Sequence, residues 1–356
     1  MGTIKFYKDE PLFGLDIGHA SLKAMQIEKL NGGALRVLGY GISSFSPSAI
    51  QNGVIIKPDV VAAAMHELFE KKLAGAITSR RVVCSLPTSR TFSRPMKVPL
   101  MDREAILEAV HLEAEQYIPI PLNSLYLDYE ITRQDEKEME LLLVAASKNI
   151  VDSYHRTLEA LQLEPIAFEP SINAASRLVQ IQGISNQEPA VIVDIGSTTS
   201  DIAVYDKTLL VSTAVGIGGD NITSLIARAL HLEEDQAAEL KDKYGIAYSE
   251  KQQRVVDAIR PALESLVHEI QKSIRYYSER ANQSGRKISR IITVGGGSVM
   301  PGLNQHLSLE LRLPTQNLDP WQKMTFGSLA NPSEIDRAML ITAAGEALVN
   351  PGEVLA

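Results

Sequence analysis

The chain contains a single cysteine among its 356 residues. No disulfide can form within it, and its seven histidines are scattered singly, without the paired spacing of a zinc site. The cysteine, Cys84, lies in a strand-like apolar segment, residues 81–86, where a reduced and buried thiol is the expected state. Disulfide and zinc chemistry are therefore set aside.

Basic stretches and long apolar runs are also missing. Lys and Arg number 35 against 43 Asp and Glu, for a formal charge of −8, and the basic residues form no block. We therefore expect no nucleic-acid partner. No apolar run reaches the roughly 18 residues of a membrane-spanning helix, and residues 1–10 are too polar for a signal peptide. A cytoplasmic protein without direct membrane insertion is expected.

One phrase, Asp-Ile-Gly, occurs in each half of the chain, at Asp16–Gly18 and at Asp194–Gly196. Each copy ends an apolar strand and leads through a turn of small or hydroxyl residues into a second strand. The turn offers N–H groups and hydroxyls to phosphate oxygens, and the carboxylate can hold the hydrated Mg²⁺ that neutralises them. A single Asp-x-Gly turn is common for steric reasons alone. The repetition predicts a nucleotide held by both turns.

Apolar periodicity predicts an α/β protein. The expected strands are residues 13–17, 22–28, 35–42, 82–86, 94–98, 125–132, 140–146, 166–169, 190–195, 201–205, 209–215 and 290–294. The expected helices are residues 59–71, 102–117, 150–163, 172–182, 222–230, 235–243 and 255–281.

The pattern changes after Pro87, which indicates an inserted module. Residues 88–147 would form a small α+β subdomain within a first lobe made of residues 1–87 and 148–184. A second lobe would span residues 185–350, followed by a tail, 351–356. An alternative, in which residues 88–147 continue one larger sheet, stays open from the sequence.

Two glycine-rich turns follow strands in the second half. One is Gly216–Asp220, which includes Gly218 and Gly219, and the other is Gly295–Ser298. Glycine lets the backbone approach a ligand with no Cβ in the way.

These turns, in this order, resemble the nucleotide site of the actin superfamily, which includes heat-shock chaperones and sugar kinases. Residues 15–23 resemble its first phosphate motif, residues 193–201 its second, residues 294–303 its adenosine motif and residues 169–175 its connecting motif. The resemblance covers residues 12–348. It implies an actin-like duplicated α/β fold, with two lobes of central mixed sheets and flanking helices, that binds ATP and Mg²⁺.

Within the superfamily the inserted module resembles the extra subdomain of the cell-division protein FtsA and of PilM, the actin-like protein of type IV pilus assembly. The second phosphate turn, rich in Ser and Thr, is more similar to PilM. FtsA-type proteins end in a basic amphipathic membrane-targeting helix, whereas residues 345–353 are acidic and broken by Pro and Gly. Asn331-Pro332 and a final helix over residues 335–349 also resemble PilM.

The resemblance assigns roles residue by residue. Asp16 and Asp194 would hold Mg²⁺, through water, and Glu169 would orient an attacking water. The phosphate contacts would come from Gly18, His19, Ser21, Lys23, Gly196, Ser197, Thr198, Thr199, Gly218 and Gly219. The adenosine side would use Lys241, Gly295, Gly296, Gly297, Ser298 and Met300.

Simpler structural roles remain open for several of these groups. The hydroxyls of Ser21, Thr198 and Thr199 can equally stabilise their own turns. Lys23 can be a solvated strand lysine, and Glu169 an exposed residue before a helix.

Three departures from the superfamily pattern weaken the expectation of hydrolysis. His19 stands where a small hydroxyl residue is usual, and Ser197 and Thr198 stand where glycines are usual. Ala238 stands where a glutamate usually precedes Lys241 on the same helix. We expect a weak Mg²⁺-dependent ATPase at most.

The resemblance implies an adaptor in which ATP acts as a conformational ligand. Its partner would be the cytoplasmic N-terminal tail of a PilN-like inner-membrane protein, held between the inserted module and the first-half core. That protein would recruit the chain to the inner face of the membrane, within the pilus assembly machinery. The alternatives are an FtsA-like filament-forming protein and a small-molecule kinase, and self-association is left open.

Overall fold

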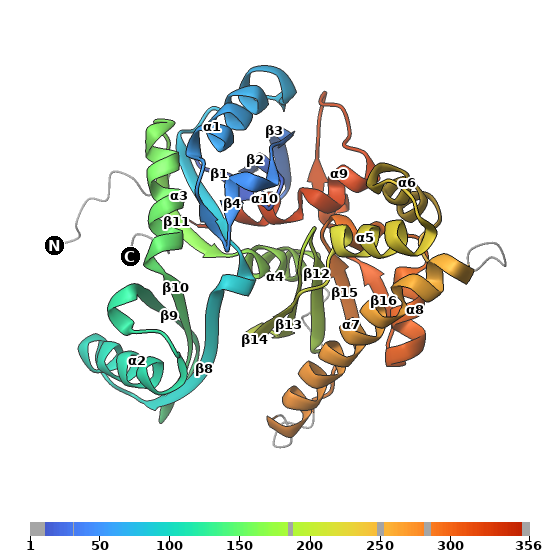
Figure 1. Ribbon diagram of the computed structural model, residues 1–356. Coiled ribbons are helices and arrows are strands. Elements are labelled where there is room, and N and C mark those ends of the chain that lie inside the picture. The colour runs from blue at the N-terminus through green and yellow to red at the C-terminus, as the bar shows by residue number, and fades with distance from the viewer. Residues whose placement is uncertain (1–10, 31, 184–187, 248–252, 281–285, 351–356) are drawn as a thin grey trace. The chain divides into compact units, whose positions relative to one another are not determined.

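The computed structural model describes residues 11–30, 32–183, 188–247, 253–280 and 286–350 (Figure 1). The expected tail, residues 351–356, and residues 184–187 at the expected boundary of the two lobes lie outside them. The chain divides into two compact units. Unit 1 comprises Met1–Ala174, Phe326–Leu329 and Thr342–Ala356, and unit 2 comprises Ala175–Thr325 and Ala330–Ile341.

The sheet of unit 1 begins with the first predicted hairpin. Its strands are β1 (Phe13–Ile17), β2 (Ser21–Lys29), β3 (Leu35–Ser44), β7 (Arg81–Leu86) and β11 (Glu164–Pro170), with β6 (Ala74–Gly75) pairing β3. They lie in the order β11-β7-β1-β2-β3, and β1 is antiparallel to β2 and parallel to β7. A small ladder of β4 (Ile50–Gln51) and β5 (Val54–Ile55) is added.

Helices α1 (Pro58–Glu67) and α3 (Lys148–Ala160) share one apolar core with this sheet. The helix expected over residues 59–71 changes after Glu67 into a wider π-helical turn, Leu68–Lys72. Cys84 is buried as predicted, and this burial, with the nearby carboxylates of Glu346 and Asp16, raises the pKa of its thiol.

Residues 88–147 build a sheet and a core of their own. Strands β8 (Thr91–Pro99), β10 (Glu138–Ser147) and β9 (Leu125–Gln134) pair in the order β8-β10-β9. Helix α2 (Arg103–Tyr117) covers one face of this sheet and contributes Ile106, Val110 and Ala114 to a separate apolar cluster. The helix begins as predicted, because the carboxylate of Asp102 accepts a hydrogen bond from the Ala105 amide at 2.9 Å.

Unit 2 repeats the strand arrangement of unit 1. Its sheet has the order β14-β13-β12-β15-β16, made of β14 (Thr208–Val215), β13 (Ser200–Asp206), β12 (Ala190–Ile195), β15 (Arg290–Val294) and β16 (Thr315–Asn317). Strand β12 is antiparallel to β13 and parallel to β15, just as β1 is to β2 and β7. The predicted duplication is therefore present in the topology.

The helices of unit 2 pack their apolar faces on this sheet. They are α5 (Gly219–Leu230), α6 (Glu234–Tyr244), α7 (Gln253–Arg280) and α8 (Leu303–Leu311). Helix α4 (Ser171–Gln182) follows β11. One long helix expected over residues 335–349 is instead two, α9 (Glu334–Met339) and α10 (Ile341–Glu346). In the described part of the chain, no helix combines the length and the apolarity needed to cross a bilayer.

The buried amide of Gln26 joins β2 to the segment before β7. Its Oε1 accepts hydrogen bonds from the backbone amides of Thr78 at 2.7 Å and Ser79 at 3.4 Å, and its Nε2 donates to the Thr78 hydroxyl. The side chain is only 1% exposed. The amide of this buried side chain is therefore satisfied by Thr78 and Ser79, which lie closer to the surface.

Replacing Gln26 with Leu should destabilise the protein by about 1–3 kcal/mol, because its hydrogen bonds to the Thr78 and Ser79 amides and to the Thr78 hydroxyl would be lost together. Chemical denaturation followed by circular dichroism measures the change. The same substitution at the exposed Gln116 of α2 is the control and should stay within about 0.5 kcal/mol. Equal effects at both positions would contradict the role given to Gln26.

Candidate functional site

In unit 1 the carboxylate of Asp16 is held at both oxygens. Lys23 Nζ lies 3.0 Å from Oδ2, and the Ser85 hydroxyl donates to Oδ1 at 2.9 Å. Lys23 reaches it because β2 pairs directly opposite β1 at this position, and Ser85 because β7 runs parallel on the other side. The structure thus gives Lys23 a partner, where the sequence left a phosphate contact and a solvated lysine open.

The turn after Asp16 is closed by its own backbone. The Gly18 amide donates to the Ser21 carbonyl at 2.9 Å. A Cβ on Gly18 would stand 2.9 Å from Lys23 Nζ, so the ammonium group lies over the turn. His19 and Ser21 are half-buried here, with part of each side chain accessible to a ligand.

Glu169 lies at the end of β11, in register with Ser85. Since Ser85 bonds to Asp16, the three polar residues occupy adjacent parallel strands at their carboxyl ends. Two strand spacings put Glu169 about 10 Å from Asp16. Its assignment as the water-positioning group stays a prediction. Ser85 itself was not predicted, although a polar residue at the end of a strand parallel to β1 was a usable signal.

In unit 2 the corresponding carboxylate, Asp194, is almost fully buried at 9% exposure. The backbone of Gly295 passes directly over it, with φ of +81°. A Cβ on Gly295 would stand 2.3 Å from Asp194 Oδ1 and 2.6 Å from the Ile195 carbonyl. Only glycine fits this position, for both its space and its backbone conformation.

The second phosphate turn is bonded to the start of α5. The Gly219 amide donates to the Gly196 carbonyl at 2.9 Å, and the Asp220 amide donates to the Ser197 carbonyl at 2.8 Å. A Cβ on Gly218 would stand 2.4 Å from that same Ser197 oxygen. The two predicted phosphate turns of unit 2 therefore touch. Helix α5 begins at Gly219, three residues before the expected start, so Gly219 belongs to its first turn.

Within the second phosphate turn, the Gly196 amide donates to the Thr199 carbonyl at 2.9 Å. This bond mirrors the one between Gly18 and Ser21 in unit 1. Ser197, Thr198 and Thr199 are half-buried, so their hydroxyls are not sealed inside the fold.

Lys241 reaches from α6 to the first turn of α5. Its Nζ donates to the Thr223 hydroxyl at 3.0 Å and to the Gly219 carbonyl at 3.4 Å. The lysine expected on the adenine-side helix thus lies beside the Gly218–Gly219 turn. Thr223, which holds it, was not predicted.

The adenosine motif packs on the end of α6. The Ile246 amide donates to the Pro301 carbonyl at 2.9 Å, and a Cβ on Gly245 would stand 2.3 Å from that oxygen. Met300 is buried at 7% exposure beside this contact. The end of α6, at Tyr244 and Gly245, is therefore in direct contact with the adenosine motif.

The Gly295–Ser298 turn has its own internal order. Ser298 is buried, and its hydroxyl donates back to the Gly295 carbonyl at 2.7 Å, so it stabilises the turn. A Cβ on Gly297 would collide with the Ile195 side chain. A Cβ on Gly296 would come 3.2 Å from Met339 Cγ on α9, a neighbour that sequence reasoning missed.

These residues fit a hydrated Mg²⁺ and a nucleotide better than a dedicated metal cage. The described residues contain no group of three or more His, Cys, Asp or Glu placed to hold a metal. Mg²⁺ usually keeps several waters and uses one or two carboxylates. Asp194 offers such a carboxylate in unit 2, and Asp16 offers one in unit 1. Asp16 would first have to give up Lys23.

Comparison with known proteins agrees with this architecture. Residues 14–350 match the family model described as type IV pilus assembly protein PilM. The chain is 25% identical to the cell division protein FtsA of Pseudomonas aeruginosa, over 85% of this chain and 83% of that protein. It is 23% identical to FtsA of Streptococcus pneumoniae, over 82% and 71%.

Solved structures share the fold. A PilM–PilN type IV pilus biogenesis complex superposes with a TM-score of 0.81 at 23% identity, covering 95% of this chain and 98% of the other. MreB5 of Spiroplasma citri bound to AMPPNP gives 0.53 at 11% identity, covering 95% of each chain. The predicted actin-like α/β fold is confirmed, and the chain belongs to the family of type IV pilus assembly protein PilM.

Proposed function

We propose that this protein is an ATP-responsive adaptor of pilus assembly. The observation that carries the proposal is the meeting of the loops in unit 2. Asp194, the Gly196–Thr199 turn, the Gly218–Gly219 turn, Lys241 and the Gly295–Ser298 turn are joined by direct contacts. The nucleotide-bound relative of the same fold supports this assignment.

The chain's own groups have distinct tasks in such a site. Asp194 would hold the water of a Mg²⁺ ion, and that ion would supply the charge that neutralises phosphate oxygens. Lys241 holds the first turn of α5 in place through Thr223 and Gly219. In unit 1, Lys23 would be the group that pairs with a phosphate oxygen, and the Asp16 carboxylate that it now neutralises would then be available to Mg²⁺-bound water.

The same geometry supports slow turnover. The amides of Gly219 and Asp220 already donate to the second phosphate turn, so they are occupied in this state. Ser197 and Thr198 add side chains where glycines are usual. A loop that is fixed in this way can bind ATP but rearranges poorly to stabilise a transition state. This favours a role for ATP as a conformational ligand.

For the partner we propose the cytoplasmic tail of a PilN-type inner-membrane protein, which would recruit this chain to the membrane. Membership of the PilM family and the fold shared with a PilM–PilN complex support this. The junction of the inserted subdomain with α3 also offers a suitable surface. There Tyr126, 47% exposed, donates to Asp152 at 3.0 Å and lies under the Lys148 ammonium group.

Asp194→Asn should weaken Mg·ATP binding by about tenfold or more, because the neutral amide holds metal-bound water poorly. Isothermal titration calorimetry measures the dissociation constant. Asp257→Asn, at an exposed carboxylate of α7 in the same unit, is the control and should leave it unchanged. Equal affinities for the two variants would refute the assignment of Asp194.

Lys23→Met should make ATP binding more dependent on Mg²⁺. If Lys23 contacts phosphate, it supplies one positive charge in the wild type, whereas in the variant the metal must supply it. We expect affinity without Mg²⁺ to fall about tenfold and affinity with saturating Mg²⁺ to fall less. Titrations with and without Mg²⁺, with the exposed Lys71→Met as control, give the two ratios. A ratio equal to that of the wild type would mean that Lys23 does not contact phosphate.

A labelled synthetic tail of the PilN-type protein from the same genome should bind with micromolar affinity, about tenfold tighter when Mg·ATP is present. Fluorescence anisotropy measures this, and Asp194→Asn should abolish the ATP effect while leaving the basal affinity. No binding in either nucleotide state would overturn the proposed partner. Sedimentation of the protein with ATP would then test the filament-forming alternative suggested by FtsA.

A further inference from the structure

The outer edge of β9 is the longest open strand edge of the inserted subdomain. Strand β9 is ten residues long, which spans about 33 Å. Within the described residues it pairs with no strand except β10. The opposite edge, β8, contains Pro95 and Pro99, which lack the amide a further strand needs. β9 contains no proline, so its edge is chemically able to add a strand.

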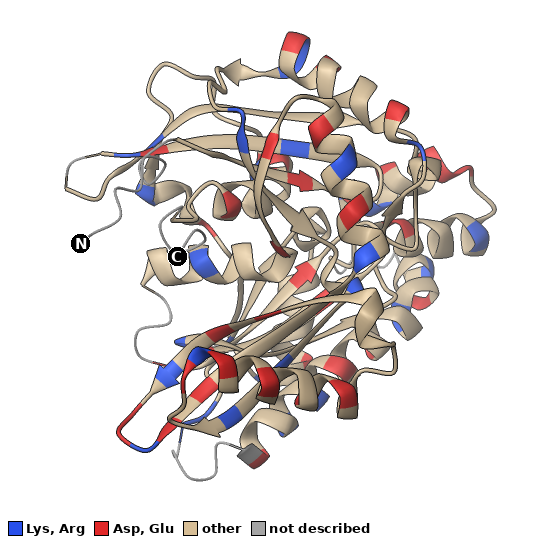
Figure 2. Cartoon of the chain, turned by 90° about the vertical axis from the view of Figure 1, so that its left-hand side faces the viewer, with Lys and Arg blue, Asp and Glu red and all other residues tan. Residues whose placement is uncertain are grey.

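The residues that flank this edge are exposed and carry negative charge. Tyr126 and Ile131 are 47% and 46% exposed, and Asp128 and Glu130 are exposed on the face away from α2. Residues 88–147 as a whole contain eleven acidic and six basic side chains. Figure 2 marks the positions of Asp and Glu in red and those of Lys and Arg in blue.

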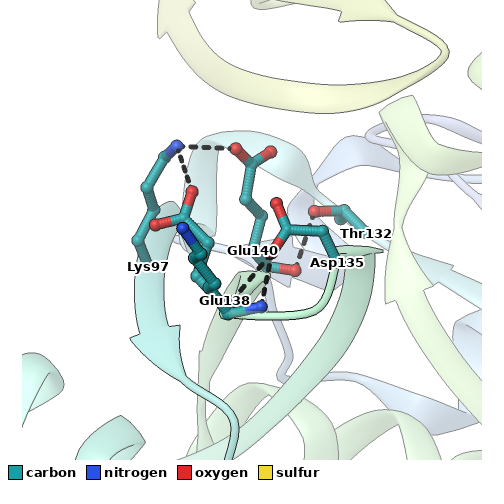
Figure 3. Close-up of polar contacts among 6 residues, drawn as sticks. Lys97, Thr132, Asp135, Glu138 and Glu140 are labelled. Atoms are coloured by element: carbon teal, nitrogen blue, oxygen red, sulfur yellow. Dashed lines mark hydrogen bonds and ion pairs between the residues drawn. The ribbon is translucent and has the colours of Figure 1, made fainter.

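Acidic groups near the hairpin turn already have partners within the subdomain. Lys97 lies 3.1 Å from Glu138 and 2.9 Å from Glu140, and Asp135 accepts the amides of Lys137 and Glu138 (Figure 3). Those backbone donors lower the pKa of Asp135. Asp128 lies outside this cluster, in the middle of β9.

Asp128 covers one donor of the strand. Its Oδ1 accepts the Tyr129 amide at 2.8 Å, so a neighbouring carboxylate occupies a hydrogen-bonding group of the backbone. A cation that draws the carboxylate away would release this amide for another strand. The Asp128 carboxylate therefore blocks strand pairing at this amide until a basic ligand draws it away.

We propose that β9 binds an extended segment of a partner protein with Lys or Arg at alternate positions, by adding it as a fourth strand. The backbone ladder would supply affinity, and the negative charges of Asp128 and Glu130 on this face would select basic side chains. A second copy of this chain fits less well. Two-fold antiparallel pairing of β9 with itself would set Asp128 and Glu130 opposite like charges. The proposal does not rest on nucleotide binding.

The test uses the full chain and a fluorescent ten-residue peptide of alternating Lys and Val. We expect saturable binding that Asp128→Lys with Glu130→Lys weakens by about tenfold or more. The matched control, Glu104→Lys with Glu108→Lys on exposed positions of α2, changes charge equally and should shift affinity less than about twofold. Binding should also protect amides of residues 125–134 from hydrogen exchange. Asp128→Asn, which keeps size and shape, should weaken binding too if the double variant fails to fold.

Three results would overturn the proposal. No saturable binding is the first. Equal loss in both charge-reversed pairs, or equal binding of the same peptide with its alternate amides N-methylated, would show diffuse charge attraction without strand addition. Protection of residues 125–134 that rises with protein concentration alone would show that a second copy occupies the edge.

Discussion

The close approach of Gly295 to Asp194 is the contact on which the loops of unit 2 depend. Any side chain there would strike the carboxylate, so the turn after β15 can close over the end of β12 only with glycine. That turn leads to Met300 and Pro301, whose carbonyl fixes the end of α6 through the Ile246 amide. Helix α6 in turn places Lys241. One steric constraint thus positions both the Asp194 carboxylate and the Lys241 ammonium group of the proposed site.

Unit 1 shares this strand topology but treats its carboxylate differently. Asp16 is neutralised by Lys23 and held by Ser85, where Asp194 is enclosed by backbone. The two units therefore share the same strand pairing but surround the carboxylate with different charges. A cation that binds Asp16 must compete with an ammonium group that is already 3.0 Å away. Asp194 has a different obstacle, since its carboxylate is mostly shielded from solvent.

The sequence predicted the fold well because its signals were local and repeated. Alternating apolar strands ending in Asp-Ile-Gly gave both hairpins, and Asp102 marked the start of α2. It missed contacts made across neighbouring elements, such as Ser85 on Asp16, Thr223 on Lys241 and Met339 over Gly296. No local pattern reveals these, since each joins residues distant in the chain. The break between α9 and α10 was missed because the apolar pattern continues across it.

Helix α3 connects the inserted subdomain to the first phosphate turn. Strand β10 ends at Ser147 and α3 begins at Lys148, so no loop separates the subdomain from the helix. Further along, Tyr154 is fully buried in the core of unit 1 and its hydroxyl lies 3.5 Å from the Ile17 carbonyl, next to Asp16. A packed helix therefore runs from the end of the subdomain to the residue next to Asp16. This continuous path is the route by which the proposed nucleotide and the proposed partner would influence each other within one unit.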